Sequence, residues 1–245
     1  MRQVASVAYI AAMKQEARIP DAPAWDRAAY PAAEAARLVG MTPTRVRRWL
    51  RGYDYRYSDG RRHKEAVLSR KGTAGTTYAS FLDLVDLLFV KRFVDHGISL
   101  QKLRRALREA TDILGEPHFA RRTFFTDGHN IYLKVREEGD AILQLLSGGQ
   151  WVIAPIIQEL GQQIDFDRPS GIARRWYPRG ATGLIVVDPL IAFGRPAVAG
   201  KGVPTAAVYD FYKAEHADQG AVGRWHGLTN LETEAAVTFE EALQR

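Results

Sequence analysis

The stretch 30–57 most restricts what this chain can fold into. Residues 32–39 are rich in alanine and carry the apolar spacing of a short helix, and Gly40 can adopt the left-handed conformation that ends one. Thr42 is a favoured N-cap residue, and Pro43 then takes the first helical position, where its missing N–H costs no hydrogen bond. These signals predict two short helices joined by a glycine turn.

The second of these helices, predicted over residues 43–50, separates apolar from basic side chains. Val46, Trp49 and Leu50 recur at the spacing of one helical face, so we expect them in the core. The arginines lie elsewhere on the cylinder: Arg45, Arg47, Arg48 and Arg51. This pattern is typical of a helix-turn-helix that binds DNA. The alternative is a small helical hairpin with a solvated charged face.

A basic hairpin is predicted directly after the helix pair. Tyr53, Tyr55 and Tyr57 alternate with polar residues, as in a strand, and Asp59-Gly60 is a strong turn signal. A basic return strand follows, so the whole predicts a winged helix-turn-helix. The second helix is expected in the major groove and the hairpin beside the DNA backbone or in the minor groove. The expected DNA-contacting residues are Thr44, Arg45, Arg47, Arg48, Arg51, Tyr55, Arg56, Arg61, Arg62 and Lys64.

The same residues resemble a known family. The DNA-binding head of MerR-type regulators has a Glu-Ala-Ala-x-x-x-Gly core and then a Thr/Ser-Pro-x-x-x-Arg recognition helix. The matching positions here are Glu34, Ala35, Ala36, Gly40, Thr42, Pro43 and Arg47. Predicted helices over 81–95, capped by Ser80, and 100–114, after Gly97 and Ser99, resemble the helices that pack behind the recognition helix in that family. The hairpin departs from the family's usual short form.

Charge is concentrated where the helix-turn-helix lies. The whole chain carries a net charge of +6, whereas residues 37–71 hold 11 Arg or Lys against three acids, a net +8. Residues 217–245 hold five acids against two basic residues, a net −3. A basic surface favours a polyanionic partner. The chain has no cysteine, no apolar run of roughly 20 residues and no clear signal peptide, so we expect a cytoplasmic protein without disulfides or membrane spans.

The middle of the chain carries weaker signals. A hairpin is predicted over 123–135 around Asp127-Gly128, and a helix over 151–160. Short alternating segments at 164–167, 173–177 and 184–187 predict a small sheet.

A second motif begins near Val187. Its residues are Asp188, Pro189, Ile191, Phe193, Gly194, Pro196, Gly200, Gly202, Pro204 and Thr205. They resemble the signature of a small domain of unknown function that recurs in bacterial antitoxins. The resemblance implies a three-helix unit, similar to a helix-turn-helix, with helices over 205–215, 220–225 and 231–243. Its second helix has only Arg224 as a cation, so we expect this unit to bind protein and not DNA.

Together the two resemblances look like a VapB-type antitoxin. They imply a homodimer that binds its double-stranded operator DNA, represses the operon and neutralises a ribonuclease toxin of the PIN type. An arginine inserted among the toxin's carboxylates could silence it. Candidate toxin-binding residues are Arg174, Arg175 and Trp176, or alternatively Arg195 and Arg224. The dimer interface is expected on helix 100–114 or, with preference, on the C-terminal unit, whose apolar residues include Val208, Phe211, Tyr212, Val237 and Phe239.

We therefore predict an α+β, mainly helical chain in four parts. These are an N-terminal arm (1–29), a winged helix-turn-helix (30–115), a connecting region with short strands (116–186) and the C-terminal three-helix unit (187–245). One alternative is a MerR-like regulator without a toxin, in which the last unit serves dimerisation.

An enzyme is the other alternative, and the sequence offers little for one. Gly200-Lys201-Gly202 lacks the other residues of a phosphate-binding P-loop, and the six histidines show no metal-ligand spacing. Asp165 and Asp167 form a lone acidic pair. We expect no cofactor, no metal and no catalytic residue.

Overall fold

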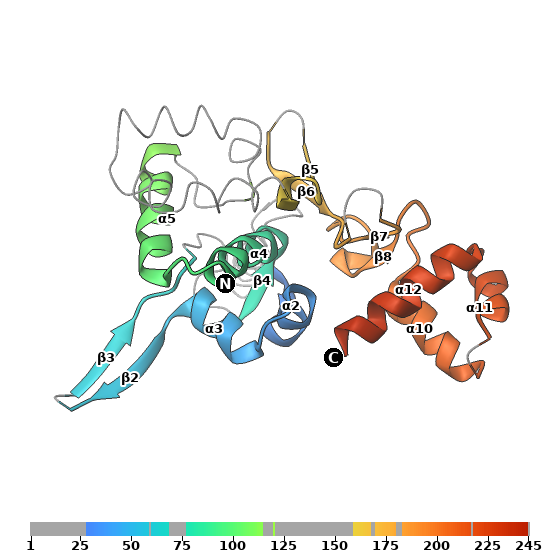
Figure 1. The fold of residues 1–245 in the computed structure, drawn as a ribbon, viewed down its shortest axis with the longest axis horizontal. Coiled ribbons are helices and arrows are strands. Elements are labelled where there is room, and N and C mark those ends of the chain that lie inside the picture. The colour runs from blue at the N-terminus through green and yellow to red at the C-terminus, as the bar shows by residue number, and fades with distance from the viewer. Residues whose placement is uncertain are drawn as a thin grey trace, which may run out of the picture.

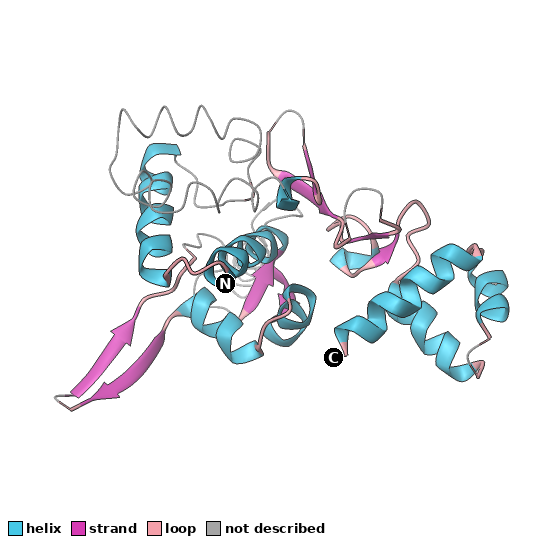
Figure 2. Ribbon diagram, in the orientation of Figure 1, coloured by secondary structure: helices cyan, strands magenta, loops and turns pink. Residues whose placement is uncertain are grey.

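The computed structural model describes residues 28–58, 60–68, 77–114, 120, 159–167, 170–179, 183–216 and 218–244. Within these ranges the chain is mixed α+β, with helices joined by short antiparallel strand pairs (Figure 2). A long hairpin projects at one end, and three C-terminal helices lie at the other (Figure 1). Most of the expected arm, the expected hairpin over 123–135 and most of the helix over 151–160 lie outside the described residues.

The predicted helix pair is confirmed. Helix α2 (Ala32–Val39) ends at Gly40, whose φ of 65° is left-handed, and α3 (Pro43–Arg51) follows. The Thr42 side chain accepts a hydrogen bond from the Arg45 backbone N–H at 3.3 Å, as expected of an N-cap. Val46, Trp49 and Leu50 are buried, so the arginines occupy the outer surface of α3.

Helix α4 (Phe81–Asp95) is the centre of the fold. Two of its acidic side chains, Asp83 and Asp86, are buried at 1% exposure. Asp83 forms a reciprocal cap with Ser80, and the Asp86 carboxylate accepts a hydrogen bond from the Ala120 N–H at 3.1 Å. The helix is buried nearly all round because α2, α5 (Leu100–Leu114) and three short strands pack against it.

Two of those strands were not predicted. Strand β1 (Ala28–Pro31) pairs antiparallel with β4 (Tyr78–Ser80), which leads directly into α4. Tyr30, in β1, is almost fully buried, and its hydroxyl donates a hydrogen bond to the Gly194 carbonyl at 2.7 Å. Burial, with the nearby charges of Glu34 and Asp188, raises the pKa of the Tyr30 phenol, so it remains a donor.

The mid-chain strands form two ladders. Strand β5 (Ile164–Phe166) pairs with β6 (Ala173–Trp176), and β7 (Ile185–Val186) pairs with β8 (Ala197–Val198). Backbone hydrogen bonds between Trp176 and Val187 join the ladders. Strand β7 precedes residue 187, where the sequence placed a domain boundary, and β8 follows it, so this strand pair joins the two sides of that boundary. The 3₁₀ turn η2 (Ala192–Gly194) lies between the two strands.

The three C-terminal helices match the expected ones. They are α10 (Thr205–Ala214), α11 (Gln219–His226) and α12 (Asn230–Leu243). Thr229 and Glu232 cap α12 reciprocally. Val208, Val237 and Phe239 are buried, and Phe211 and Tyr212 pack against the same core. The expectation of surplus apolar surface for a dimer is therefore wrong for Val208, Val237 and Phe239, which form the unit's own interior, whereas Phe211 and Tyr212 are half-buried.

The hairpin consists of β2 (Tyr53–Tyr57) and β3 (Gly60–Lys64), and Gly52 connects it to α3. Gly52 has a φ of 75°, and a Cβ placed there would lie 2.3 Å from the Lys64 carbonyl oxygen. Val67 N–H bonds the Trp49 carbonyl at 2.8 Å, so the returning chain also packs against the end of α3. Position 52, where the chain leaving the hairpin passes the end of α3, therefore requires glycine. Its φ is left-handed, and a side chain there would clash with the Lys64 carbonyl.

We predict that Gly52→Ala lowers the free energy of unfolding by about 2–4 kcal/mol, from the left-handed φ and the backbone clash together. Gly97→Ala is the matched control, because Gly97 has a φ of 87° and open space around its Cβ position. It should cost only about 1 kcal/mol. Denaturant titration of both variants measures the difference. An equal loss of unfolding free energy in the two variants would show that the backbone contact at position 52 adds no steric cost.

Candidate nucleic-acid interface

The outer surface of α3 is cationic. Thr44, Arg47, Arg48 and Arg51 are exposed, as the sequence predicts for residues that contact DNA. Arg45 differs from them, because its guanidinium lies over the Trp49 ring at 4.6 Å and the side chain is half-buried. Its position is fixed by that stacking, which holds one cation at the edge of the exposed surface.

The hairpin has two different faces. Side chains alternate along each strand, and Tyr55 lies opposite Arg62, while Tyr53 lies opposite Lys64. Arg48 of α3 lies over the Tyr53 ring at 4.6 Å, so this face of the hairpin is continuous with the surface of α3. We call it the tyrosine face; it comprises Tyr53, Tyr55, Tyr57, Arg62 and Lys64.

The opposite face carries an acid among its cations. Asp54 accepts a hydrogen bond from His63 at 2.7 Å and lies 3.4 Å from the Arg61 guanidinium. The His63 bond, with help from the nearby Arg61 charge, lowers the pKa of Asp54, so the carboxylate stays ionised. Arg56 lies opposite Arg61. The hairpin therefore presents a purely cationic and aromatic face on one side and a partly neutralised face on the other.

A hollow of about 500 Å³ lies where α3, the base of the hairpin and the start of α5 meet. Its charged lining residues are all cations: Arg45, Arg48, Lys64 and Arg104. Arg104 also donates from Nε to the Ala66 carbonyl at 3.1 Å, which ties α5 to the chain leaving the hairpin. Arg104 was not among the predicted residues, because its helix is distant in sequence and only the fold brings it to α3.

The predicted toxin-binding residues are not gathered at one place. Trp176 is buried at 3% exposure, and Arg175 pairs with the buried Asp188 carboxylate, with 2.6 Å between Nε and Oδ2. Trp176 therefore belongs to the interior and not to an exposed cluster, while the Arg175 side chain is 34% exposed and held by its pair with Asp188. Arg174, Arg195 and Arg224 are exposed, on β6, on the loop before β8 and on α11.

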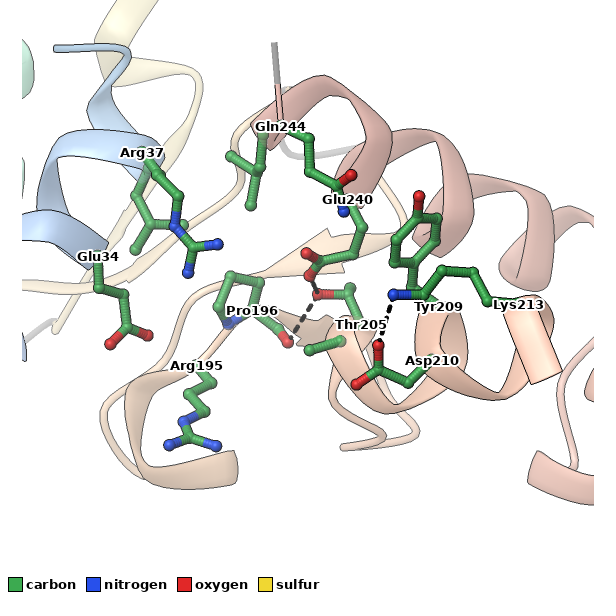
Figure 3. Close-up of a pocket in the computed structure, with 13 residues that line it drawn as sticks. Glu34, Arg37, Arg195, Pro196, Thr205, Tyr209, Asp210, Lys213, Glu240 and Gln244 are labelled. Atoms are coloured by element: carbon green, nitrogen blue, oxygen red, sulfur yellow. Dashed lines mark hydrogen bonds and ion pairs between the residues drawn. The ribbon is translucent and has the colours of Figure 1, made fainter. Parts of the chain in front are cut away.

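A second hollow, of about 320 Å³, lies between α2 and the C-terminal unit (Figure 3). Glu34 and Arg37 line it from α2, while Lys213 lines it from α10 and pairs with Asp210 at 3.0 Å. On its floor the Thr205 hydroxyl bonds the buried Glu240 carboxylate. Both signs of charge are present, so the hollow shows no preference for one class of ligand.

The described residues contain neither a membrane-spanning helix nor a metal-binding cluster of side chains. No helix among them is long and apolar enough to cross a membrane. In the same part of the chain, no group of three or more His, Cys, Asp or Glu residues is placed to hold a metal ion.

Comparison with known proteins gives relatives at low identity. No protein-family model matches the sequence. The chain is 24% identical over 212 residues to "Putative antitoxin VapB45" of Mycobacterium tuberculosis, an alignment that covers 82% of this chain and 88% of the relative. It is 34% identical over 87 residues to proteins of Mycobacterium bovis and Mycobacterium tuberculosis named uncharacterized HTH-type transcriptional regulators, of which it spans only 37%.

The crystal structure of Rv2018 from Mycobacterium tuberculosis superposes with a TM-score of 0.62. The superposition covers 87% of this chain and 99% of that one, at 20% sequence identity. The two chains share a fold.

The two faces of the hairpin yield a matched pair of variants. If the tyrosine face meets DNA, Arg62→Ala with Lys64→Ala should lower DNA affinity and reduce the log–log salt slope by about 1.8, roughly 0.9 per lost phosphate contact. Arg56→Ala with Arg61→Ala removes the same charge from the other face and should change the slope much less. Fluorescence anisotropy over a salt series measures both, and equal slopes would reject this orientation of the hairpin.

Proposed function

We propose that this protein is a DNA-binding antitoxin of the cytoplasm. It binds its own operator through a MerR-like head, represses the operon as a homodimer, and neutralises a ribonuclease toxin of the PIN type. The observation that carries the DNA-binding part is the continuous cationic surface formed by α3 and the tyrosine face of the hairpin. The antitoxin part is supported by the relative of similar length that is named as an antitoxin.

In this proposal α3 enters the major groove, which admits one helix. Arg47 and Arg48 are exposed and can pair bidentately with guanine or with a phosphate, and Thr44 can bond either. The tyrosine face then follows the backbone beside the groove. Phosphate contacts from the hairpin position the helix, and base contacts from α3 supply specificity.

A homodimer follows from the size of this surface. One short helix reads only a few base pairs, whereas a symmetric pair reads two half-sites. The C-terminal unit remains our preferred interface, although Val208, Val237 and Phe239 are buried and cannot contribute to it. Trp225 is 73% exposed and stacks on Phe211 with 5.5 Å between ring centroids, which presents a rigid aromatic surface on α11. A partner copy could cover it.

For toxin neutralisation, three of the predicted arginines remain available: Arg174, Arg195 and Arg224. An exposed guanidinium can pair with the carboxylates that would otherwise hold a metal in the ribonuclease. The competing function is a transcriptional regulator without a toxin, in which the C-terminal unit serves dimerisation. It is favoured by the second group of relatives, whose names describe only regulation.

We predict that Arg47→Ala with Arg48→Ala weakens operator binding and lowers its salt slope by up to about 1.8. Val46 and Trp49 are buried on the other side of α3, so the fold should survive and circular dichroism should be unchanged. Electrophoretic mobility shift with the DNA upstream of the gene measures the effect. Parent affinity in the folded variant would remove α3 from the proposed DNA contact.

We also predict that a ribonuclease of the PIN type is encoded beside this gene and that the protein inhibits it. Purified toxin should cleave RNA alone and not with a molar equivalent of this chain. Arg174→Ala, Arg195→Ala and Arg224→Ala, made singly, should identify which arginine is needed. Full cleavage in the presence of the parent protein would favour the regulator without a toxin.

Sedimentation at micromolar concentration tests the proposed homodimer, and a lone 27.4 kDa species would contradict it.

A further inference from the structure

The loop 188–195 has an unusual backbone. Ala192, Phe193 and Gly194 follow one another with φ values of 49°, 57° and 81°, all in the left-handed region. Two of these residues carry a side chain that disfavours this region, and Asn or Gly would adopt it more readily than Phe. Strained residues of this kind persist where the surrounding structure fixes them, and they are concentrated at functional sites.

The surroundings fix this loop firmly at both ends. The buried Asp188 carboxylate accepts from the Leu190 N–H at 2.8 Å and from Arg175 at 2.6 Å. At the other end, the Gly194 carbonyl accepts the buried Tyr30 hydroxyl at 2.7 Å, and a Cβ on Gly194 would lie 2.6 Å from that hydroxyl oxygen. The loop is therefore held in one conformation by residues from β1 and β6.

What this loop presents to solvent is apolar. Phe193 is 94% exposed, the largest value among the exposed large hydrophobic residues described, and Leu190 is 64% exposed. Arg195 follows, also exposed. Phe193 contributes almost no packing to the fold, so burial within this chain cannot explain a strained aromatic residue at that position. A rigid aromatic residue beside an arginine is the usual composition of a protein-binding hot spot.

We propose that loop 188–195 is a preformed knob that inserts Leu190 and Phe193 into an apolar pocket of the ribonuclease toxin, while Arg195 pairs with carboxylates at the edge of that pocket. The inference rests on the proposed antitoxin function and names the surface that performs it. Because the loop is already ordered, binding loses little conformational entropy.

A second copy of this chain is a poorer candidate for the partner that receives this loop. A convex knob needs a concave apolar receptor, and charged side chains line both of the hollows described above. The hollow beside α3 is lined by cations and would repel Arg195, and the hollow beside α2 already contains Arg195 itself. DNA is also a poorer candidate for this partner, because the two most exposed residues of the loop, Leu190 and Phe193, are uncharged.

The test uses the full chain and the purified toxin, with affinity measured by calorimetry. Phe193→Asn should bind the toxin at least about tenfold more weakly, as expected for a hot-spot residue. Its melting temperature should equal or exceed that of the parent, because Asn tolerates the left-handed conformation. Leu190→Ser should also weaken binding. Leu231→Ser is the matched control, because Leu231 is 66% exposed on α12, and it should stay within about twofold of the parent.

Each outcome has one meaning. If the parent inhibits the toxin and Phe193→Asn binds it equally well, the knob is rejected while the antitoxin function stands. If the parent neither binds nor inhibits the toxin, the proposed function fails and the knob fails with it. If Phe193→Asn changes only sedimentation or operator affinity, the loop serves a second copy or DNA, which also overturns the inference.

Discussion

The burial of α4 is the constraint on which the rest of the described structure depends. A helix that is apolar nearly all round must be covered on every side. Here α2 covers one side, α5 another, and β1, β4 and β6 the remainder. Its two buried aspartates are tolerated because Asp83 bonds the Ser80 N–H and Asp86 bonds the Ala120 N–H. The orientation of α3 and the hairpin follows, since α2 anchors α3 to this centre.

The parts that could be predicted from sequence are those with local signals. Gly40, Thr42 and Pro43 define the turn between α2 and α3, and Ser80 defines the start of α4, because caps depend on neighbours a few residues away. Strand β2 was predictable as well, because the alternation of its tyrosines with polar residues is also a local signal. The positions expected to contact DNA on α3 are exposed, apart from the half-buried Arg45.

What could not be predicted depends on pairings between distant residues. Trp176 and Arg175 have the composition of an exposed binding cluster, but Trp176 is buried where its strand pairs with Val187, and Arg175 is held by the Asp188 carboxylate. The Tyr30–Gly194 bond joins residues 164 positions apart and leaves no local trace. The left-handed backbone and the exposure of Phe193 likewise have no local signal in the sequence.

The projecting hairpin is a site for limited proteolysis, and its rate of cleavage would depend on whether DNA is bound. An isolated two-stranded ribbon is marginally stable, and nearly all side chains of β2 and β3 are exposed, so its local opening does not require the core to unfold. The peptide bonds after Arg56, Arg61 and Arg62 are therefore open to trypsin in the free protein. A bound duplex along the tyrosine face would shield them, and the time course of limited digestion would then distinguish free from occupied molecules.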